Sequence, residues 1–333
     1  MTRDNYIPTC YFPSTVMIVE NAHHSINEIT KLLEKNIFYK VFNTTTDALE
    51  VVHNGHQLDQ FNTQNILEDN EHSKSNYVFN LDLSGLHTEV YNPQRFNEAS
   101  VIVVDFDLPH MNGLEFCRRM ENSLIKRVLL TSHSNEDLVI QAFNDGIIDA
   151  YIQKNDVNLA KELGGTIKRL QLSYFQKMSN IVVRMLSVTS PSILDESDFF
   201  DLFYTIVTTN NIIEYYIMEN SGSFLLLDAD ANPSYLIVKS QQDMQLHYEL
   251  AICNQAPESV LNEFLSGEKI PCFWQKDNFS TVDWDDWSMF LTPAQKLIGK
   301  NTYFYAYVKN PSLNNIQPDR ILSFKHYLRS IRR

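Results

Sequence analysis

The stretch Val101 to Gly113 reads VIVVDFDLPHMNG: four aliphatic residues, a pair of acids, then a proline and a glycine. Uninterrupted aliphatic residues are typical of a strand that helices cover on both faces of a parallel sheet. Proline and glycine then mark a turn. The stretch therefore predicts Asp105 and Asp107 at the carboxyl end of a buried strand.

Apolar runs of strand length recur through the first half of the chain, mostly with helical patterns between them. The five runs are Thr15–Val19, Phe38–Phe42, Val101–Val104, Arg127–Leu130 and Ala150–Ile152. This βαβ rhythm predicts an α/β fold, a doubly wound parallel five-stranded sheet. Functional side chains in such sheets gather outside the carboxyl edge of the strands.

Polar residues that suit phosphoryl chemistry follow four of these runs. They are Glu20 and Asn21, Asp105 and Asp107, Thr131 and Ser132, and Lys154. We expect Asp105 to be the nucleophile, because a carboxylate can accept a phosphoryl group. A hard cation held by oxygen ligands would neutralise that group, while a hydroxyl and an ammonium would bind its oxygens.

The segment Asp105-Phe-Asp-Leu-Pro109-His-Met-Asn112-Gly113 fits the pattern D-x-x-x-P-x-x-[DN]-G and resembles the receiver domain of two-component response regulators. The resemblance covers roughly residues 14 to 156. It implies that a sensor histidine kinase or a phosphotransfer protein phosphorylates the chain. The implied roles are phosphoacceptor for Asp105, switch residues for Thr131 and Tyr151, and phosphate binding for Thr131 and Lys154.

The resemblance also implies a Mg²⁺ site made by Glu20, Asn21, Asp105 and the backbone of Asp107. Receivers usually place two acids after the first strand, whereas this chain has Glu20 followed by Asn21. The amide removes one charged oxygen from the ligand set, so we expect weak Mg²⁺ binding.

An insertion separates the second and third strand runs. Residues 54–100 are about forty residues longer than a receiver needs there, and long loops inside compact domains are often functional. The insertion is Asn-rich at first and then apolar enough to predict a small hairpin around Ser84 and Gly85. It either binds a partner or is an inert surface excursion.

Apolar residues from Ala160 to Met185 recur at spacings of three and four, which predicts a helix longer than the last helix of a receiver. Its apolar stripe either pairs with a second chain or packs on its own sheet. Thr189-Ser-Pro191 ends the pattern. We therefore expect a receiver domain at 1–156 with an insertion at about 54–100, a connector helix at 157–190 and an output domain at 191–333.

The last 143 residues, 191–333, predict an α+β domain whose short turns favour an antiparallel meander. Strands are expected at Ile212–Met218, Phe224–Leu227, Tyr235–Lys239 and Tyr303–Val308. Helices are expected at Ile193–Val207, Gln242–Ile252, Glu258–Leu265 and Arg320–Ile331. The domain carries neither a helix-turn-helix signature nor a Gly-rich phosphate loop.

The candidates for an output site are Glu214, Asp228, Asp230 and Lys239. Metal-dependent nucleases of the restriction-endonuclease type hold Mg²⁺ with carboxylates and orient water with a lysine on the next strand. Some bacterial quorum-sensing response regulators are similar in pairing a receiver with such an output. Ile237 stands where such nucleases have their second acid, so a metal site here would be incomplete. The ordinary interpretation is that Asp228, Asp230 and Lys239 are turn and edge-strand residues.

Charge and cysteine usage limit the partners and the compartment. A net charge of −14, spread along the chain, does not favour nucleic acid, although the last helix is basic. Four widely separated cysteines predict free thiols in a reducing compartment. No apolar run is long enough to span a membrane. We expect a cytoplasmic protein that does not bind membranes.

The leading interpretation is a response regulator that is switched by phosphorylation of Asp105. Dimerisation is one route by which it could pass the signal to the output domain. One alternative is a phosphorylation-independent pseudo-receiver that binds proteins, in which Asn21 has removed the metal site. The other is a nuclease-like enzyme under receiver control. Each of these residues, taken singly, also has a purely structural interpretation. Asp105 could cap a turn, Tyr151 could belong to the core, and Lys154 could be a solvated side chain.

Overall fold

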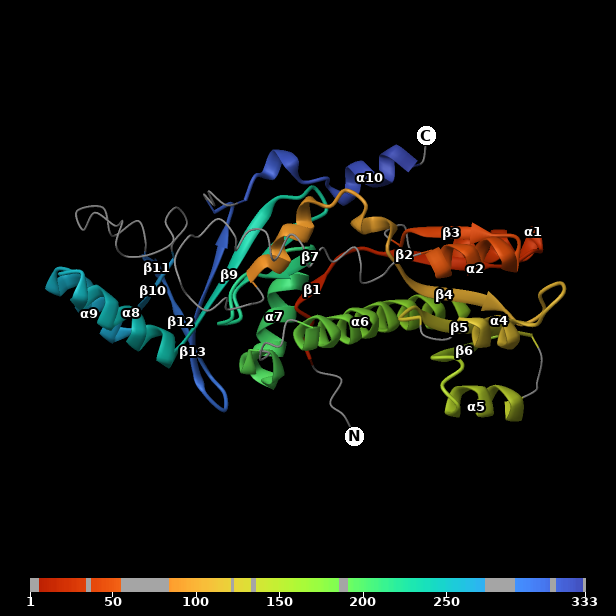
Figure 1. Cartoon of the computed structure of the whole chain (residues 1–333), viewed down its shortest axis with the longest axis horizontal. Helices are drawn as coiled ribbons and strands as arrows, with labels where there is room; N and C mark the ends of the chain where they lie inside the picture. The colour runs from red at the N-terminus through yellow and green to blue at the C-terminus, as the bar shows by residue number, and fades with distance from the viewer. Residues whose placement is uncertain are drawn as a thin grey trace. The chain divides into compact units, whose positions relative to one another are not determined.

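The computed structural model describes residues 6–33, 37–54, 84–120, 123–132, 136–185, 191–272, 291–311 and 316–331. The chain divides into two compact units (Figure 1). The parallel-sheet unit comprises residues 12–65 and 94–181, and the antiparallel-sheet unit comprises residues 1–11, 66–93 and 182–333.

Five parallel strands form the sheet of the first unit in the order β3-β2-β4-β5-β6. They are β2 (Thr15–Val19), β3 (Tyr39–Phe42), β4 (Ala99–Asp105), β5 (Lys126–Thr131) and β6 (Ala150–Gln153). All five predicted strands are confirmed, with ends that differ by at most two residues. Their carboxyl ends therefore meet at one edge, as the α/β prediction requires.

Helices cover both faces of this sheet, because successive strand residues point to opposite sides. Val103 and its neighbours on one face pack with α1 (His23–Leu32) and α6 (Leu159–Met185). Val104 and its neighbours on the other face pack with three helices, α2 (Thr45–Asn54), α4 (Gly113–Arg119) and α5 (Glu136–Asn144). The fold is doubly wound.

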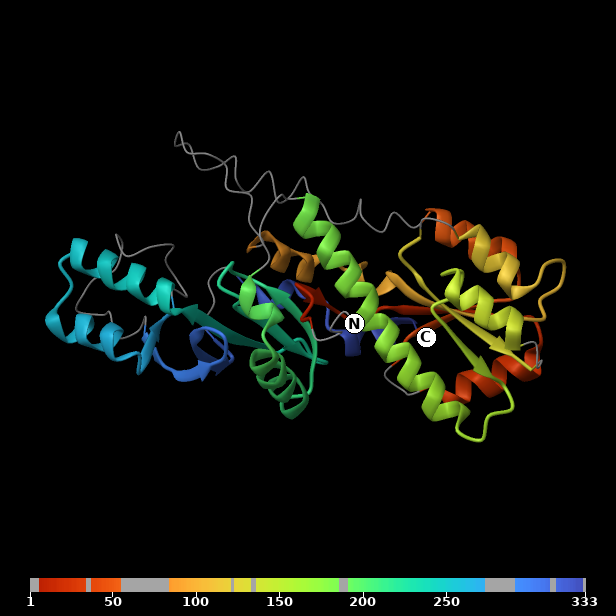
Figure 2. The same ribbon diagram turned by 90° about the horizontal axis from the view of Figure 1, so that it is seen from below.

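Helix α6 confirms the predicted long helix, and Figure 2 shows it as one continuous element. Leu163, Ile167 and Leu170 belong to the core of the parallel sheet. Tyr174 and Met178 are also buried within the single chain. The apolar stripe from Leu163 to Met178 is thus buried within the chain, which favours packing on its own sheet over pairing with a second chain.

The second unit holds a six-stranded antiparallel sheet in the order β1-β7-β8-β9-β13-β12. Its strands are β1 (Cys10–Tyr11), β7 (Ile212–Ile217), β8 (Phe224–Asp228), β9 (Pro233–Ser240), β12 (Gln295–Ile298) and β13 (Thr302–Lys309). A separate pair joins β10 (Lys269–Pro271) to β11 (Leu291–Pro293). The predicted meander is confirmed.

The helices of this unit lie close to their predicted places. They are α7 (Ser197–Thr209), α8 (Gln241–Cys253), α9 (Glu258–Ser266) and α10 (Phe324–Ile331), with 3-10 turns η3 (Ser192–Asp195) and η6 (Pro318–Arg320). Phe203 of α7 packs against Tyr215 and Phe224 with ring centroids 4.9 Å apart in both pairs. These rings join α7 to the sheet.

The predicted domain boundaries are corrected at the N-terminus. Cys10 and Tyr11 pair with Tyr216 and Tyr215 of β7, so the first residues of the chain add an edge strand to the antiparallel sheet. Residues 12–65 and 94–181, which include most of helix α6, stay with the parallel sheet. The connector is therefore not a separate domain, because its apolar side chains complete the first core.

The predicted hairpin around Ser84 and Gly85 is wrong. Residues from Ser84 to Tyr91 form the 3-10 helix η1, followed by η2 (Arg95–Asn97). Leu86 and Val90 are both buried, and their spacing of four suits a helical turn rather than alternating strand faces. Tyr91 Oη accepts a hydrogen bond of 2.8 Å from the amide of Gln317, within the antiparallel-sheet unit.

No helix in the described ranges is long and apolar enough to cross a membrane. Two predicted features fall outside the residues that the structure describes: the Asn-rich part of the insertion, and the boundary at Thr189 and Ser190.

Candidate functional site

Four predicted site residues lie at the carboxyl edge of the parallel sheet. Asp105 is the last residue of β4, Thr131 ends β5, Glu20 directly follows β2 and Lys154 directly follows β6. Because β2, β4, β5 and β6 are consecutive neighbours in one parallel sheet, these residues share one edge. We refer to Glu20, Asp105, Thr131 and Lys154 as the edge cluster.

Lys154 joins two buried carboxylates. Its Nζ lies 2.8 Å from Oδ1 of Asp105 and 3.1 Å from Oε2 of Glu20. Asp105 is only 5% exposed and Glu20 only 1%. A carboxylate so buried needs a compensating charge, and the ammonium group supplies it to both acids.

The two acids also set the protonation of the lysine. Burial alone would lower the pKa of Lys154, but the hydrogen bond and charge of Asp105, followed by those of Glu20, outweigh it. The net effect raises the pKa of Lys154 above its ordinary value. The ammonium form is therefore held firmly in place beside Asp105.

Two carboxylates are available to a cation at this edge. Oε1 of Glu20 accepts the amide N–H groups of Asn21 and Ala22, each at 3.0 Å, which fixes its orientation. Asn21 and Asp107 are exposed. Within the described ranges, no three His, Cys, Asp or Glu side chains lie close enough together to hold a metal ion. Mg²⁺ commonly uses one or two carboxylates with water and phosphate oxygens, so this donor set fits it without a third acid.

The turn after Asp105 is tied to the neighbouring strand and to α4. The amide of Phe106 donates to the carbonyl of Leu130 at 2.8 Å, and the amide of Gly113 donates to the carbonyl of Phe106 at 2.9 Å. Asn112 caps α4 by accepting the amide of Glu115 at 2.8 Å. The motif residues thus hold the backbone around Asp105 in place.

Gly113 is required at its position by close approach. A Cβ atom there would lie 2.4 Å from the carbonyl oxygen of Asp105 and 2.9 Å from Cδ1 of Leu129. Carbon and oxygen atoms do not approach this closely without displacement of the backbone. The glycine of the motif therefore lets α4 begin against the strand that carries Asp105.

The two predicted switch residues differ in exposure. Thr131 is buried, and its carbonyl oxygen accepts the amide of Lys154 at 2.9 Å, which ties β5 to the residue after β6. Tyr151 lies on the edge strand β6 and is 38% exposed. Thr131 is therefore shielded from solvent, whereas part of Tyr151 is exposed.

A family model of the response regulator receiver domain matches residues 60–161, which include Asp105, Thr131, Tyr151 and Lys154. The solved structure of the Legionella pneumophila response regulator LqsR is 43% identical, over 98% of this chain and 96% of that chain, with a TM-score of 0.84. The chain belongs to the response regulator family. This response regulator resembles LqsR in both of its units, since the match covers nearly the whole of each chain.

Two further solved structures match about half of this response regulator. The signal receiver domain of an HD domain-containing protein from Pseudomonas fluorescens Pf-5 is 16% identical over 48% of this chain and 96% of that chain, with a TM-score of 0.32. A CheY-like receiver domain protein from Methanospirillum hungatei JF-1 is 17% identical over 50% and 98%, with a TM-score of 0.31. A search of curated proteins finds no match.

The four output candidates of the response regulator are not brought together. Asp228 accepts the amides of Asp230 and Asn232, and so caps its own turn. Asp230 pairs with Lys325 at 2.9 Å, whereas Glu214 accepts a hydrogen bond of 2.6 Å from Tyr216. Among the described residues, these three acids do not form a group that could hold a metal ion.

Lys239 is held by an acid that the sequence analysis missed. Its Nζ lies 2.6 Å from Oε2 of Glu219, which also accepts the hydroxyls of Ser221 and Ser223 at 2.9 and 3.0 Å. Burial would raise the pKa of Glu219, but the lysine and the two hydroxyls lower it overall. The sequence offered one signal for this cluster, the serines two and four residues after Glu219. The approach of Lys239 to Glu219 depends on the pairing of strands in the sheet, which the sequence does not show.

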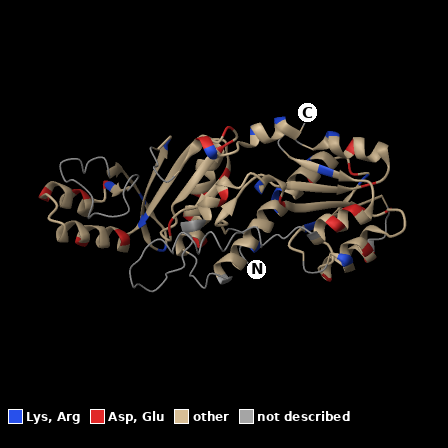
Figure 3. Ribbon diagram, turned by 45° about the horizontal axis from the view of Figure 1, so that its top comes forward, with Lys and Arg blue, Asp and Glu red and all other residues tan. Residues whose placement is uncertain are grey.

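Basic and acidic residues are mixed along the described part of the response regulator. Figure 3 shows Lys and Arg interspersed with Asp and Glu along both units. On the basic helix α10, Lys325 is already paired with Asp230. Phosphate-backbone binding would need an excess of unpaired cations on one face.

Proposed function

We propose that Asp105 accepts a phosphoryl group from a sensor histidine kinase or a phosphotransfer protein. The observation that supports it is the edge cluster itself, with the Lys154 ammonium 2.8 Å from a buried, strand-terminal carboxylate. Such partners work where ATP is present, so the proposal includes a cytoplasmic location.

The transfer forms one bond and breaks one. A carboxylate oxygen of Asp105 attacks the phosphorus of a phosphohistidine, and the P–N bond breaks with its electron pair passing to the imidazole, which takes up a proton. Lys154 pairs with the phosphoryl oxygens and compensates their charge. Glu20 keeps the ammonium in position, because it holds Nζ at 3.1 Å.

Glu20, Asp105, the amide oxygen of Asn21 and the backbone of Asp107 would hold Mg²⁺, which supplies positive charge to the phosphoryl oxygens when bound. Asn21 contributes a neutral oxygen where a second acid would contribute a charged one. We therefore expect Mg²⁺ to bind weakly.

Phosphorylation adds a charge of about −1.5 to −2 at Asp105 and so biases a two-state element. In the proposed switch, the hydroxyl of Thr131 moves to the phosphoryl group and Tyr151 changes its rotamer. Helix α5, which follows Thr131, would move with them. It carries Leu138, Ile140 and Phe143 exposed, so it offers apolar surface for a phosphorylation-dependent homodimer.

The test combines intact-mass spectrometry with light scattering after incubation with acetyl phosphate and Mg²⁺. Wild type should gain one phosphoryl mass, Asp105→Asn none, and Asp145→Asn, an exposed acid of the same unit, as much as wild type. A larger dimer fraction only in phosphorylated samples supports the switch.

The second candidate function is a phosphorylation-independent interaction module, and Asn21 is the observation that favours it. Failure of wild type to gain mass at high Mg²⁺, together with a gain in Asn21→Asp, would decide for this candidate. Failure of both would remove the metal explanation and the proposed phosphoacceptor with it.

A further inference from the structure

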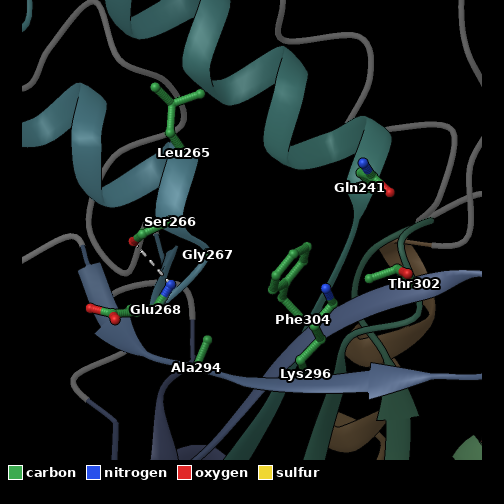
Figure 4. Close-up of a pocket in the computed structure, with 9 residues that line it drawn as sticks. All are labelled: Gln241, Leu265, Ser266, Gly267, Glu268, Ala294, Lys296, Thr302 and Phe304. Carbon is green, nitrogen blue, oxygen red and sulfur yellow. Dashed lines mark hydrogen bonds between the residues drawn. The ribbon is translucent and has the colours of Figure 1, made fainter.

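A pocket opens in the antiparallel-sheet unit, away from the edge cluster in sequence and in unit. Its volume is about 440 Å³, within the range of small-molecule sites. The residues that line it include Gln241, Ser266, Gly267, Lys296, Thr302 and Phe304 (Figure 4). They come from the start of α8, the end of α9 and strands β12 and β13.

The Phe304 ring forms a fixed wall of this pocket. It lies on β13 and is packed against Gly267, the residue that ends α9 with a left-handed φ of 68°. A Cβ atom on Gly267 would lie 2.4 Å from Cε1 of Phe304. The turn after α9 therefore packs closely around the Phe304 ring. This close packing fixes the position of the ring, unlike that of a mobile surface side chain.

Lys296 places a cation beside the ring. Its Nζ lies 5.9 Å from the centroid of Phe304. Two other lysines of this unit are neutralised, since Lys239 pairs with Glu219 and Lys269 pairs with Glu263 at 2.8 Å. No acid in the described part of the chain lies within ion-pair distance of Lys296. Its charge is therefore available to a ligand.

The remaining polar groups are arranged around the opening. Gln241 and Thr302 lie on one side of the ring in Figure 4, and the carboxylate of Glu268 is directed away from it. The capping box of Ser240 and Asp243 already satisfies the N-terminus of α8, so the helix end adds no anion site of its own. The cationic character of the pocket comes from Lys296.

We propose that this pocket binds a small organic anion with a flat apolar body. The body stacks on Phe304, and the anionic group pairs with Lys296, whose Nζ lies over the ring at 5.9 Å from its centroid. The hydroxyl of Thr302 and the amide of Gln241 supply hydrogen bonds to polar substituents. The proposal does not depend on phosphorylation of Asp105.

The test compares two probes that share a ring system and differ in charge, indole-3-acetate and indole-3-acetamide. Saturation-transfer NMR titrations of the full chain should show both bound, with dissociation constants on the order of 0.1–1 mM. The acetate should bind about 2–5-fold more tightly, as an exposed ion pair allows. Absence of saturation by either probe at millimolar concentrations would overturn the proposal.

Variants locate the binding. Lys296→Gln should make the affinities of the two probes equal, whereas the matched control Lys309→Gln, on the same sheet but outside the lining, should keep the acetate preference. Phe304→Leu should weaken both probes about tenfold through loss of the stacking surface. If Phe304→Leu fails to fold, the result for Lys296→Gln alone decides whether the probes bind at this site. The Lys296 side chain is exposed, so we expect this variant to fold. An unchanged preference in Lys296→Gln contradicts the site.

Discussion

Gly113 begins α4 directly against the backbone of Asp105, and this contact predicts an unusual response to substitution. Gly113→Ala would place Cβ 2.4 Å from the Asp105 carbonyl oxygen, so the backbone of the phosphoacceptor must move. We expect a loss of about 1–3 kcal/mol in the free energy of unfolding. Urea denaturation measures it, and slower phosphorylation by acetyl phosphate should accompany it.

Gly165 provides the matched control. It lies inside α6, and a Cβ atom added there would meet no neighbouring atom within 4 Å, so Gly165→Ala encounters no obstacle. Alanine is favoured over glycine in a helix by about 0.5–1 kcal/mol, and this variant should be more stable than wild type. Equal effects of both substitutions would argue against the steric explanation at Gly113.

Glu98 makes the stability of the parallel-sheet unit depend on pH. Burial raises the pKa of Glu98 to about 7, against the opposing hydrogen bond from Tyr174 of α6. The folded chain therefore keeps a proton that the unfolded chain releases near pH 4.5. The contribution of Glu98 to the free energy of unfolding is therefore greatest below pH 4.5. It falls by about 2–3 kcal/mol as the pH rises to 7.

Glu98→Gln tests this assignment, because the amide can still accept from Tyr174 but does not titrate. Hydrogen exchange of the β2 and β4 amides should show the decline between pH 4.5 and 7 in wild type and not in the variant, after correction for intrinsic exchange. Glu162→Gln, an exposed acid on α6, should behave like wild type. A decline that persists in Glu98→Gln assigns it to another group.

Among the secondary-structure elements, those with regular patterns and local turns were predictable. Val101–Val104 reads as a buried strand without any other information, and the spacing from Ala160 to Met185 fixes α6. Strand β1 was not predictable, because two residues carry no periodicity and their partner in β7 lies some two hundred residues away. Short β12 gave no signal for the same reason.

The edge cluster was predictable for a different reason than the output contacts. Parallel strands bring their ends together, so Asp105 and Lys154 could be placed at one edge from the strand pattern alone. The pairing of Lys239 with Glu219 arises because the end of β9 lies beside the turn after β7. The two residues are far apart in the sequence, so their contact could not be predicted from it. Antiparallel sheets with several edges allow many such pairings.

Glu196 joins two elements of the antiparallel-sheet unit, the start of α7 and the turn between β12 and β13. Its buried carboxylate accepts the amide of Lys300 at 2.9 Å, the side chain of Asn301 at 3.2 Å and the hydroxyl of Tyr303 at 3.1 Å. Glu196→Ala removes the acceptor that these three donors share. We expect it to lower the free energy of unfolding by about 2–4 kcal/mol, measured by urea denaturation.

Asp195 is the control, because it is the preceding residue, carries the same charge and is exposed. Asp195→Asn should change the free energy of unfolding by less than about 0.5 kcal/mol. Glu196→Gln should fall between the two, since one of its oxygens can still accept. Equal stability of the Asp195 and Glu196 variants would show that the hydrogen bonds to the turn contribute nothing.

At the scale of the whole molecule, the two units are interleaved along the chain. The antiparallel-sheet unit takes its edge strand β1 from before the parallel sheet and η1 from within it. Ile7, Cys10, Leu86 and Val90 of these segments are all buried. Burial of Ile7, Leu86 and Val90 stabilises the unit by about 1.5–3 kcal/mol for each side chain, before the entropy cost of ordering the chain is subtracted.

A fragment of residues 191–333 should therefore fail to fold by itself, although it contains most of the antiparallel sheet. We expect no cooperative thermal transition in its circular dichroism and rapid proteolysis, because the β7 edge and the surface under η1 are uncovered. A fragment of residues 12–181 keeps all five parallel strands and most of α6, so it should unfold cooperatively. If residues 191–333 melt as they do in the full chain, β1 and η1 are dispensable. If both fragments fail, the units depend on each other for folding, and interleaving alone does not explain the loss.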